Sequence, residues 1–135
     1  MKFIIRRIKG IIIAINGMFY LLKNEDSIKV QTLVCIFFIF LGYYFEINKS
    51  EWIIQILLIG FVLTTEALNT VAEKICDFIN PKYDERIKMI KDISAGAVSF
   101  AVISSLIILL IILIFSSYLG LIKSHIFSAT VFNAS

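Results

Sequence analysis

Acidic and amide side chains recur at helical spacing in the middle of the chain. The positions are Glu66, Asn69, Glu73 and Asp77. At about 100° per residue they fall within a wedge of roughly 80° on one helix face. Oxygen atoms gathered beside lysines could hold Mg²⁺ and a nucleotide, and the deepest carboxylate, Glu66, suits a general base. This stripe is therefore the first candidate for a chemical site.

Glu66 is the most informative member of the stripe, because the run before it consists almost entirely of hydrocarbon side chains. An ionisable group at membrane depth is costly and is a functional-site hypothesis by default. Two simpler interpretations stay open. The membrane span could end early and leave the acids in solvent, or Asn69 could hydrogen-bond to a neighbouring helix. The first fits Glu66 poorly, and the second does not explain two carboxylates on one stripe.

A bilayer is the solvent that the composition indicates. The chain has 135 residues, 59% of them hydrophobic, and a mean hydropathy of +0.93. A soluble domain of this length cannot hide so much apolar surface. We therefore expect an all-α membrane protein with one membrane domain over 1–135. Its expected parts are an amphipathic surface helix over 1–26, spans over 28–47, 52–79 and 92–122, and a tail over 123–135.

The second span is expected to run on into a cytoplasmic extension that carries the stripe, and a polar loop is expected over 82–91. Lysine and arginine gather in the N-terminal arm and around this loop. By contrast, the only basic residue in the 46–51 hairpin is Lys49, and the only one in the tail is Lys123. The positive-inside rule then predicts a cytoplasmic N-terminus and an external C-terminus.

Other motifs narrow the kind of site. Cys35 and Cys76 lie far apart in apolar runs and are interpreted as core fillers, and the one histidine, His125, cannot complete a Cys/His metal site. The glycines form neither of the phosphate-binding loops of soluble nucleotide enzymes. The net charge of +3 is modest, and no nucleic-acid partner is expected. Spacing alone indicates a polar site at the inner membrane face.

The stretch Glu66–Asp77, E-A-L-N-T-V-A-E-K-I-C-D, resembles the E-x-x-N-[ST]-x-x-E-x-x-x-D signature of the prokaryotic diacylglycerol kinase family. This family of small integral-membrane lipid kinases includes undecaprenol kinases. The segments N-P-K-Y-D and I-K-M-I-K-D-I-S-A-G-A-V resemble its proline-containing turn and the opening of its third helix, and Asn24-Glu25 matches its N-E pair. The resemblance implies an enzyme of the bacterial inner membrane. It would use ATP and Mg²⁺ to phosphorylate the hydroxyl of diacylglycerol or undecaprenol.

The resemblance also implies roles for the matched residues. Glu66 would be the catalytic base, Asn69 would position the reacting groups, and Glu25 and Glu73 would hold Mg²⁺. The implied nucleotide contacts are Arg6, Glu25, Glu73, Lys82, Tyr83, Asp84, Lys91 and Asp92, and the implied lipid contacts are Glu66, Ala95 and Trp52. Family members are homotrimers, so a homotrimeric bundle is expected, with each site shared between two subunits.

Two other functions are weighed against the kinase. A small ion or proton transporter could use Glu66 as its titrating acid. A transport path would need polar side chains through the whole span, but the stripe lies at one end of it, and the one polar residue in 53–63 is Gln55. A non-catalytic membrane subunit could assemble through the small residues Ala95, Gly96 and Ala97. That function leaves the acidic residues unexplained.

Overall fold

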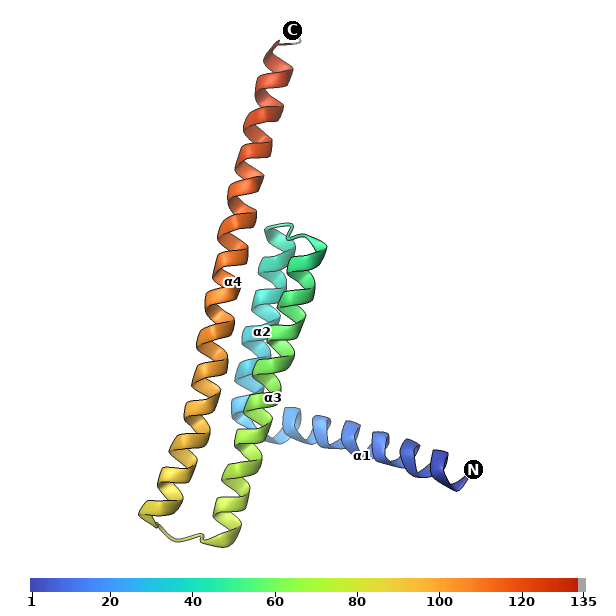
Figure 1. Cartoon of the computed structure of the whole chain (residues 1–135), viewed down its shortest axis with the longest axis vertical. Coiled ribbons are helices and arrows are strands. Elements are labelled where there is room, and N and C mark those ends of the chain that lie inside the picture. Colours follow the sequence, from blue (N-terminus) through green and yellow to red (C-terminus); the bar gives the residue numbers. More distant parts are fainter. Residues whose placement is uncertain (134–135) are drawn as a thin grey trace.

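All the regular secondary structure in residues 1–133 is helical. A computed structural model describes the backbone of residues 1–133 and the side chains of residues 1–122. The helices are α1 (Lys2–Asn24), α2 (Asp26–Tyr44), α3 (Lys49–Ile79) and α4 (Glu85–Asn133), and residues 1–133 contain no strand. Helices α2, α3 and α4 run alongside one another, whereas α1 projects sideways from the bundle (Figure 1). The expected all-α fold is confirmed.

Three of these helices are long and apolar enough to cross a membrane: α2, α3 and the Glu85–Ile122 part of α4. Their large apolar side chains point mostly outward. Phe40 is 65% exposed and Phe100 is 79% exposed. Such a surface is costly in water and favourable in hydrocarbon. The expected membrane protein with three spans is thus confirmed.

The α3–α4 loop is shorter than expected. The prediction of a polar loop over 82–91 is wrong, because α4 begins at Glu85. The cause is local: Oδ1 of Asp84 accepts a hydrogen bond from the backbone N–H of Arg86 at 2.8 Å and so starts the helix early. At its other end α4 runs on to Asn133, and the side chains of the expected 123–135 tail lie outside the described residues.

Close packing holds the α2–α3 hairpin together. A Cβ on Gly42 would lie 2.9 Å from Oε1 of Gln55, so the two helices could not approach as they do with a larger residue. Gln55 is 1% exposed and donates from Nε2 to the carbonyl oxygen of Phe38 at 2.6 Å. Asn48 begins α3 with a capping box that Glu51 completes.

Helix α4 packs mainly against α3. Its buried residues recur at spacings of three and four, which places them on one face: Val98, Ala101, Ser105, Leu109 and Ile112. Near the hairpin, the hydroxyl of Ser116 donates to the carbonyl oxygen of Phe45 at 2.9 Å. Cys35 and Cys76 are both buried and free, which confirms that they fill the core.

Candidate active site

The acidic stripe of α3 enters the bundle at Glu66. Glu66 is 6% exposed and Asn69 is 8% exposed, whereas Glu73, one turn further along, is at the surface. The hydroxyl of Thr70 donates to the backbone carbonyl of Glu66 at 3.1 Å, so it does not occupy the carboxylate. The interpretation that Glu66 is simply solvated beyond the end of its span does not hold.

Asn69 links the stripe and leaves one acceptor free. Its Nδ2 donates to Oε1 of Glu73 at 3.1 Å. Its Oδ1 is buried and has no hydrogen-bond partner among the described residues. A buried polar atom of this kind normally has a partner, so this oxygen is available to a ligand.

Glu25 contacts the polar end of α3 through Lys74, a residue that was not predicted to belong to the site. It is the one residue between α1 and α2, and its Oε1 lies 2.8 Å from Nζ of Lys74. The Glu25 side chain is 20% exposed, whereas that of Lys74 is 53% exposed. Because Lys74 follows Glu73 in sequence, this ion pair brings Glu25 to the polar end of α3. The position of Lys74 inside the motif was the available signal.

A pocket opens between Glu66 and the first turns of α2. Its walls are Asp26, Ser27, Val30, Gln31 and Glu66. Ser27 and Glu66 thus line the same pocket from two different helices. Neither Ser27 nor Gln31 was predicted to belong to the site, although their four-residue spacing places both on one face of α2.

Gln31 also lines a second, apolar groove between the three spanning helices. The groove includes Cys35 and Phe38 of α2, Val62 of α3 and Leu109 of α4. Gln31 is thus common to the polar pocket at Glu66 and to the apolar groove. This arrangement suits an amphiphile whose hydroxyl lies beside a carboxylate and whose chain lies in hydrocarbon.

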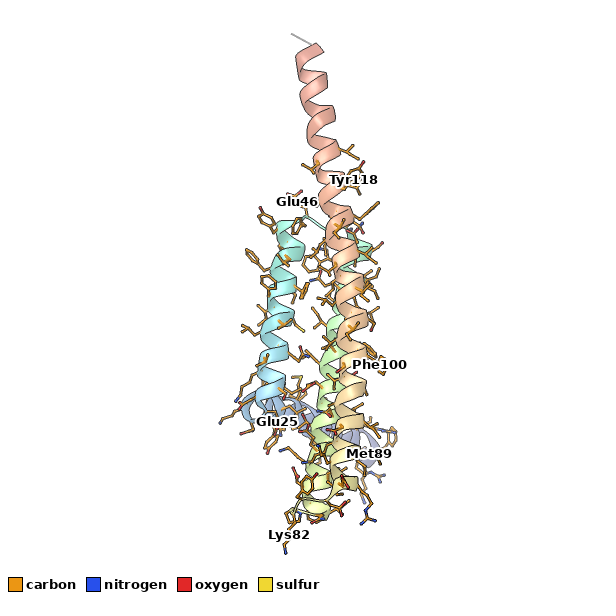
Figure 2. All side chains as sticks on the ribbon, turned by 90° about the vertical axis from the view of Figure 1, so that its left-hand side faces the viewer. Glu25, Glu46, Lys82, Met89, Phe100 and Tyr118 are labelled. Atoms are coloured by element: carbon orange, nitrogen blue, oxygen red, sulfur yellow. The ribbon has the colours of Figure 1, made fainter. Side chains whose placement is uncertain are left out.

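A third depression lies at the α3–α4 loop, near the Lys82 end of the bundle, with the Glu46 hairpin at the opposite end of α3 (Figure 2). It brings together several of the residues expected to contact nucleotide, namely Lys82, Tyr83, Asp84 and Lys91, with Asp77 and Lys88. Nζ of Lys91 lies 2.5 Å from Oδ1 of Asp77. Lysines beside a loop of this kind could bind phosphate oxygens.

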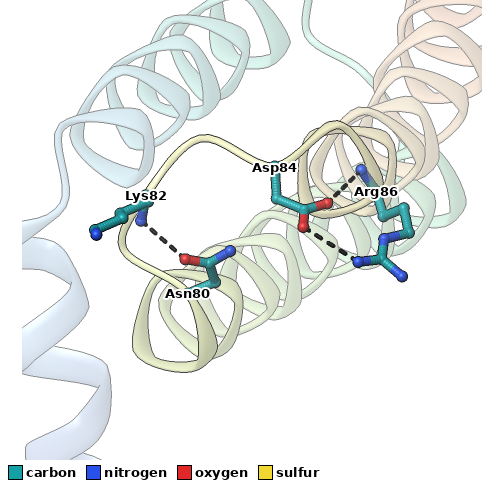
Figure 3. A network of polar contacts seen from close by, with 4 residues as sticks. All are labelled: Asn80, Lys82, Asp84 and Arg86. Atoms are coloured by element: carbon teal, nitrogen blue, oxygen red, sulfur yellow. Dashed lines mark hydrogen bonds and ion pairs between the residues drawn. The ribbon is translucent and has the colours of Figure 1, made fainter.

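Asp84 is turned toward its own helix in this depression (Figure 3). Besides its bond to the backbone of Arg86, its Oδ2 lies 3.4 Å from the guanidinium Nη2 of the same residue. These hydrogen bonds from Arg86 hold the pKa of Asp84 below its ordinary value. The backbone N–H of Lys82 is held in turn by Oδ1 of Asn80 at 3.1 Å.

Some predicted site residues lie elsewhere in the single chain. Arg6 is exposed far out on α1 beside Lys2. Trp52 packs against Tyr43 at the hairpin, with ring centroids 4.9 Å apart, and lies about 21 Å along α3 from Glu66. Asp92 and Ala95 are exposed on α4. Within one chain, these residues do not join the stripe.

The oxygen donors of the stripe fit a hard divalent cation. The described residues hold no group of three or more His, Cys, Asp or Glu that could bind a metal. The available donors are the Glu25 and Glu73 carboxylates and the unpartnered Oδ1 of Asn69. Mg²⁺ commonly takes one or two carboxylates and completes its shell with water and substrate phosphates. The donor set is consistent with that habit.

Comparison with known proteins decides the family. The family model described as prokaryotic diacylglycerol kinase matches residues 12–113. The chain belongs to the prokaryotic diacylglycerol kinase family. It is also 36% identical over 109 residues to the undecaprenol kinase of Bacillus subtilis (strain 168), a match that covers 80% of this chain and 89% of that protein. The family predicted from the Glu66–Asp77 motif is thus confirmed.

Membership of the diacylglycerol kinase family makes this chain a lipid kinase that acts on an alcohol. The transporter and the non-catalytic subunit are not favoured. Gln55, the polar residue that a transport path would have needed, instead bonds to the Phe38 carbonyl inside the bundle.

Proposed function

We propose that this lipid kinase transfers the γ-phosphoryl group of ATP to undecaprenol, with Mg²⁺ as cofactor. The observation that carries the proposal is the buried Glu66 carboxylate at the polar mouth of an apolar groove, with Gln31 common to both. The similarity to an undecaprenol kinase supports the polyprenol as substrate. Diacylglycerol, which gives the family its name, is the alternative that the experiment must separate.

Glu66 is the base in this proposal. Its carboxylate takes the proton of the lipid hydroxyl as the hydroxyl oxygen bonds to the γ-phosphorus. The bond from that phosphorus to the bridging oxygen breaks, and ADP leaves with the electron pair. Asn69 lies one turn away and orients Glu73 through its amide. Because the bilayer confines the lipid, positioning supplies much of the rate.

Glu25 and Glu73 hold the cation in this proposal, and the free Oδ1 of Asn69 lies on the same helix face. When bound, Mg²⁺ neutralises charge on the phosphate oxygens. The nucleotide lies over the α3–α4 loop, against Lys82, Tyr83, Asp84, Lys91 and Asp92. Lysines at this loop are supported as phosphate contacts by the depression that they line.

The active form is proposed to be a homotrimer in a bacterial inner membrane, with the N-terminus cytoplasmic and the C-terminus outside. Arg6 lies far from its own stripe on a helix with no buried residue, so it would contact the nucleotide of a neighbouring subunit. Trp52 and Ala95 would contact the lipid chain at a distance from its hydroxyl. The lysine and arginine distribution supports the orientation.

The test uses the purified protein in lipid nanodiscs with labelled ATP, Mg²⁺ and either undecaprenol or diacylglycerol. We expect label transfer to undecaprenol in preference. Glu66→Gln and Glu73→Gln should each lower turnover by at least about 10²-fold. Leu68→Ala, on the exposed face of the same helix, is the control and should stay active. Turnover that survives Glu66→Gln would remove the proposed base, and preferred transfer to diacylglycerol would remove the proposed substrate.

A further inference from the structure

The joint between α1 and α2 consists of one residue. Glu25 has an extended backbone, with φ −107° and ψ 115°. Its N–H donates to the carbonyl oxygen of Leu21 at 3.0 Å and closes α1, and its carbonyl oxygen accepts from the N–H of Lys29 at 3.1 Å and opens α2. A contact that fixes the Glu25 side chain therefore constrains the direction in which α1 leaves the bundle.

Lys74 makes that contact from a different helix. Its ammonium lies 2.8 Å from the Glu25 carboxylate. Helix α1 has no buried residue, so apolar burial gives it little anchoring within one chain. A second ion pair near this joint, Lys29 with Asp26 at 2.7 Å, joins two residues of α2 and so connects no helix to another.

We propose that Lys74 is a positioning residue, which holds Glu25 and the α1–α2 joint against the polar end of α3. The inference rests on the proposed role of Glu25 as a ligand of Mg²⁺. In the absence of metal the Lys74 ammonium compensates the partly buried Glu25 carboxylate, and it keeps this ligand at the polar end of α3. Glu25 would be the carboxylate that holds the divalent cation, and Lys74 would then give up its ion pair with it. The site is thus pre-assembled, and α1 has one preferred direction before the nucleotide binds.

The direction of α1 can be measured without turnover. Spin labels would be placed at Ile13 of α1 and Phe78 of α3, which are 71% and 89% exposed, in a chain with Cys35 and Cys76 replaced by alanine. Labelled chain would be mixed with excess unlabelled chain before reconstitution, and distances read by pulsed electron resonance without nucleotide or metal. In Lys74→Met we expect the population at the main distance, relative to the rest, to fall about fivefold.

Several variants separate positioning from general loss of structure. Lys74→Arg should restore the main distance, and so should the exchange Glu25→Lys with Lys74→Glu, although the exchanged chain should remain inactive because it lacks the ligand. Lys29→Met, which breaks a pair of similar length within α2, should leave the distances unchanged. In assays, Lys74→Met should raise the KM for Mg–ATP about fivefold with little change in kcat.

The outcomes are decisive in either direction. A distance distribution that is the same in Lys74→Met and wild type, or that the charge exchange fails to restore, would overturn the positioning role. Such a result would leave the kinase proposal standing, because that proposal depends on Glu66→Gln and Glu73→Gln. Inactivity of those two variants alone says nothing about the joint.

Discussion

Nζ of Lys91 lies 2.5 Å from Oδ1 of Asp77, and this ion pair joins the start of α4 to the end of α3 inside the depression at the loop. The pair holds a lysine at the place where the proposed nucleotide lies. Both side chains are partly exposed, at 33% and 63%, so the pair contributes little to stability. Its effect should appear in ATP use.

Asp77→Asn should raise the KM for ATP about fivefold, because Lys91 loses the group that orients it. Lys91→Met should raise it further, by about tenfold or more, because the phosphate contact itself is lost. Steady-state kinetics at saturating lipid would measure both. Glu85→Gln removes an acid from the first turn of the same helix and serves as the control. If Asp77→Asn and Glu85→Gln changed the KM for ATP equally, the effect would come from the loss of one negative charge near the site and not from the Lys91–Asp77 ion pair.

Asn69→Ala should lower kcat by about 10–100-fold, since Glu73 loses the amide that orients it at 3.1 Å. Asn69→Asp should be at least as damaging, because it places a carboxylate beside that of Glu73. Single-turnover label transfer would measure the chemical step. Unchanged single-turnover rates in both variants would exclude Asn69 from the positioning of the site.

Gly42→Ala should destabilise the bundle by about 1–3 kcal/mol through overpacking. The new methyl group would lie 2.9 Å from Oε1 of Gln55 and 3.0 Å from the Trp52 ring. Thermal unfolding in detergent would measure the loss. Gly60→Ala is the matched control in α3, because nothing lies within 4 Å of its Cβ position; it should be neutral or stabilising by up to about 1 kcal/mol. Equal stability of the two variants would contradict the close approach of α2 and α3.

The cap of α4 should persist in acid. Hydrogen bonds from Arg86 lower the pKa of Asp84, so its stabilisation is complete above the unfolded pKa and is lost as the pH falls through the lower folded value. The difference in unfolding midpoint between wild type and Asp84→Ala should stay constant above about pH 5 and shrink below about pH 4. Asp84→Asn keeps an acceptor at this position and should lose less. A difference that grows with acid would refute the assignment.

Much of the architecture could be predicted because each membrane span is a long run of apolar residues in the sequence. The stripe from Glu66 to Asp77 also follows from helical period alone. Helical periodicity does not predict which residues of different helices contact one another. The ion pair of Glu25 with Lys74 depends on the angle at a one-residue joint, and the groove past Gln31 depends on how α2 sits against α3.

Sequence patterns also leave other features undetermined. The loop before α4 was predicted too long because residues 82–91 are mostly charged. The Asp84 cap nevertheless starts the helix at Glu85. Arg6 and Trp52 were assigned through family motifs, and motifs carry no information about which copy of the chain supplies a residue. In the sequence Gln55 is an isolated polar residue in a span. Only the packed structure shows that its amide donates a hydrogen bond to the Phe38 carbonyl.

The single-residue joint at Glu25 also bears on bilayers of differing thickness. If α1 rests in the headgroup layer, as expected for an amphipathic surface helix, the Glu25 carboxylate at its end lies at the same height, whatever the tilt of the spanning helices. A thicker or thinner membrane would then be accommodated at the far, hairpin side of the bundle. The enzyme would keep its register with the alcohol groups of its lipids as the composition of the cell envelope changes.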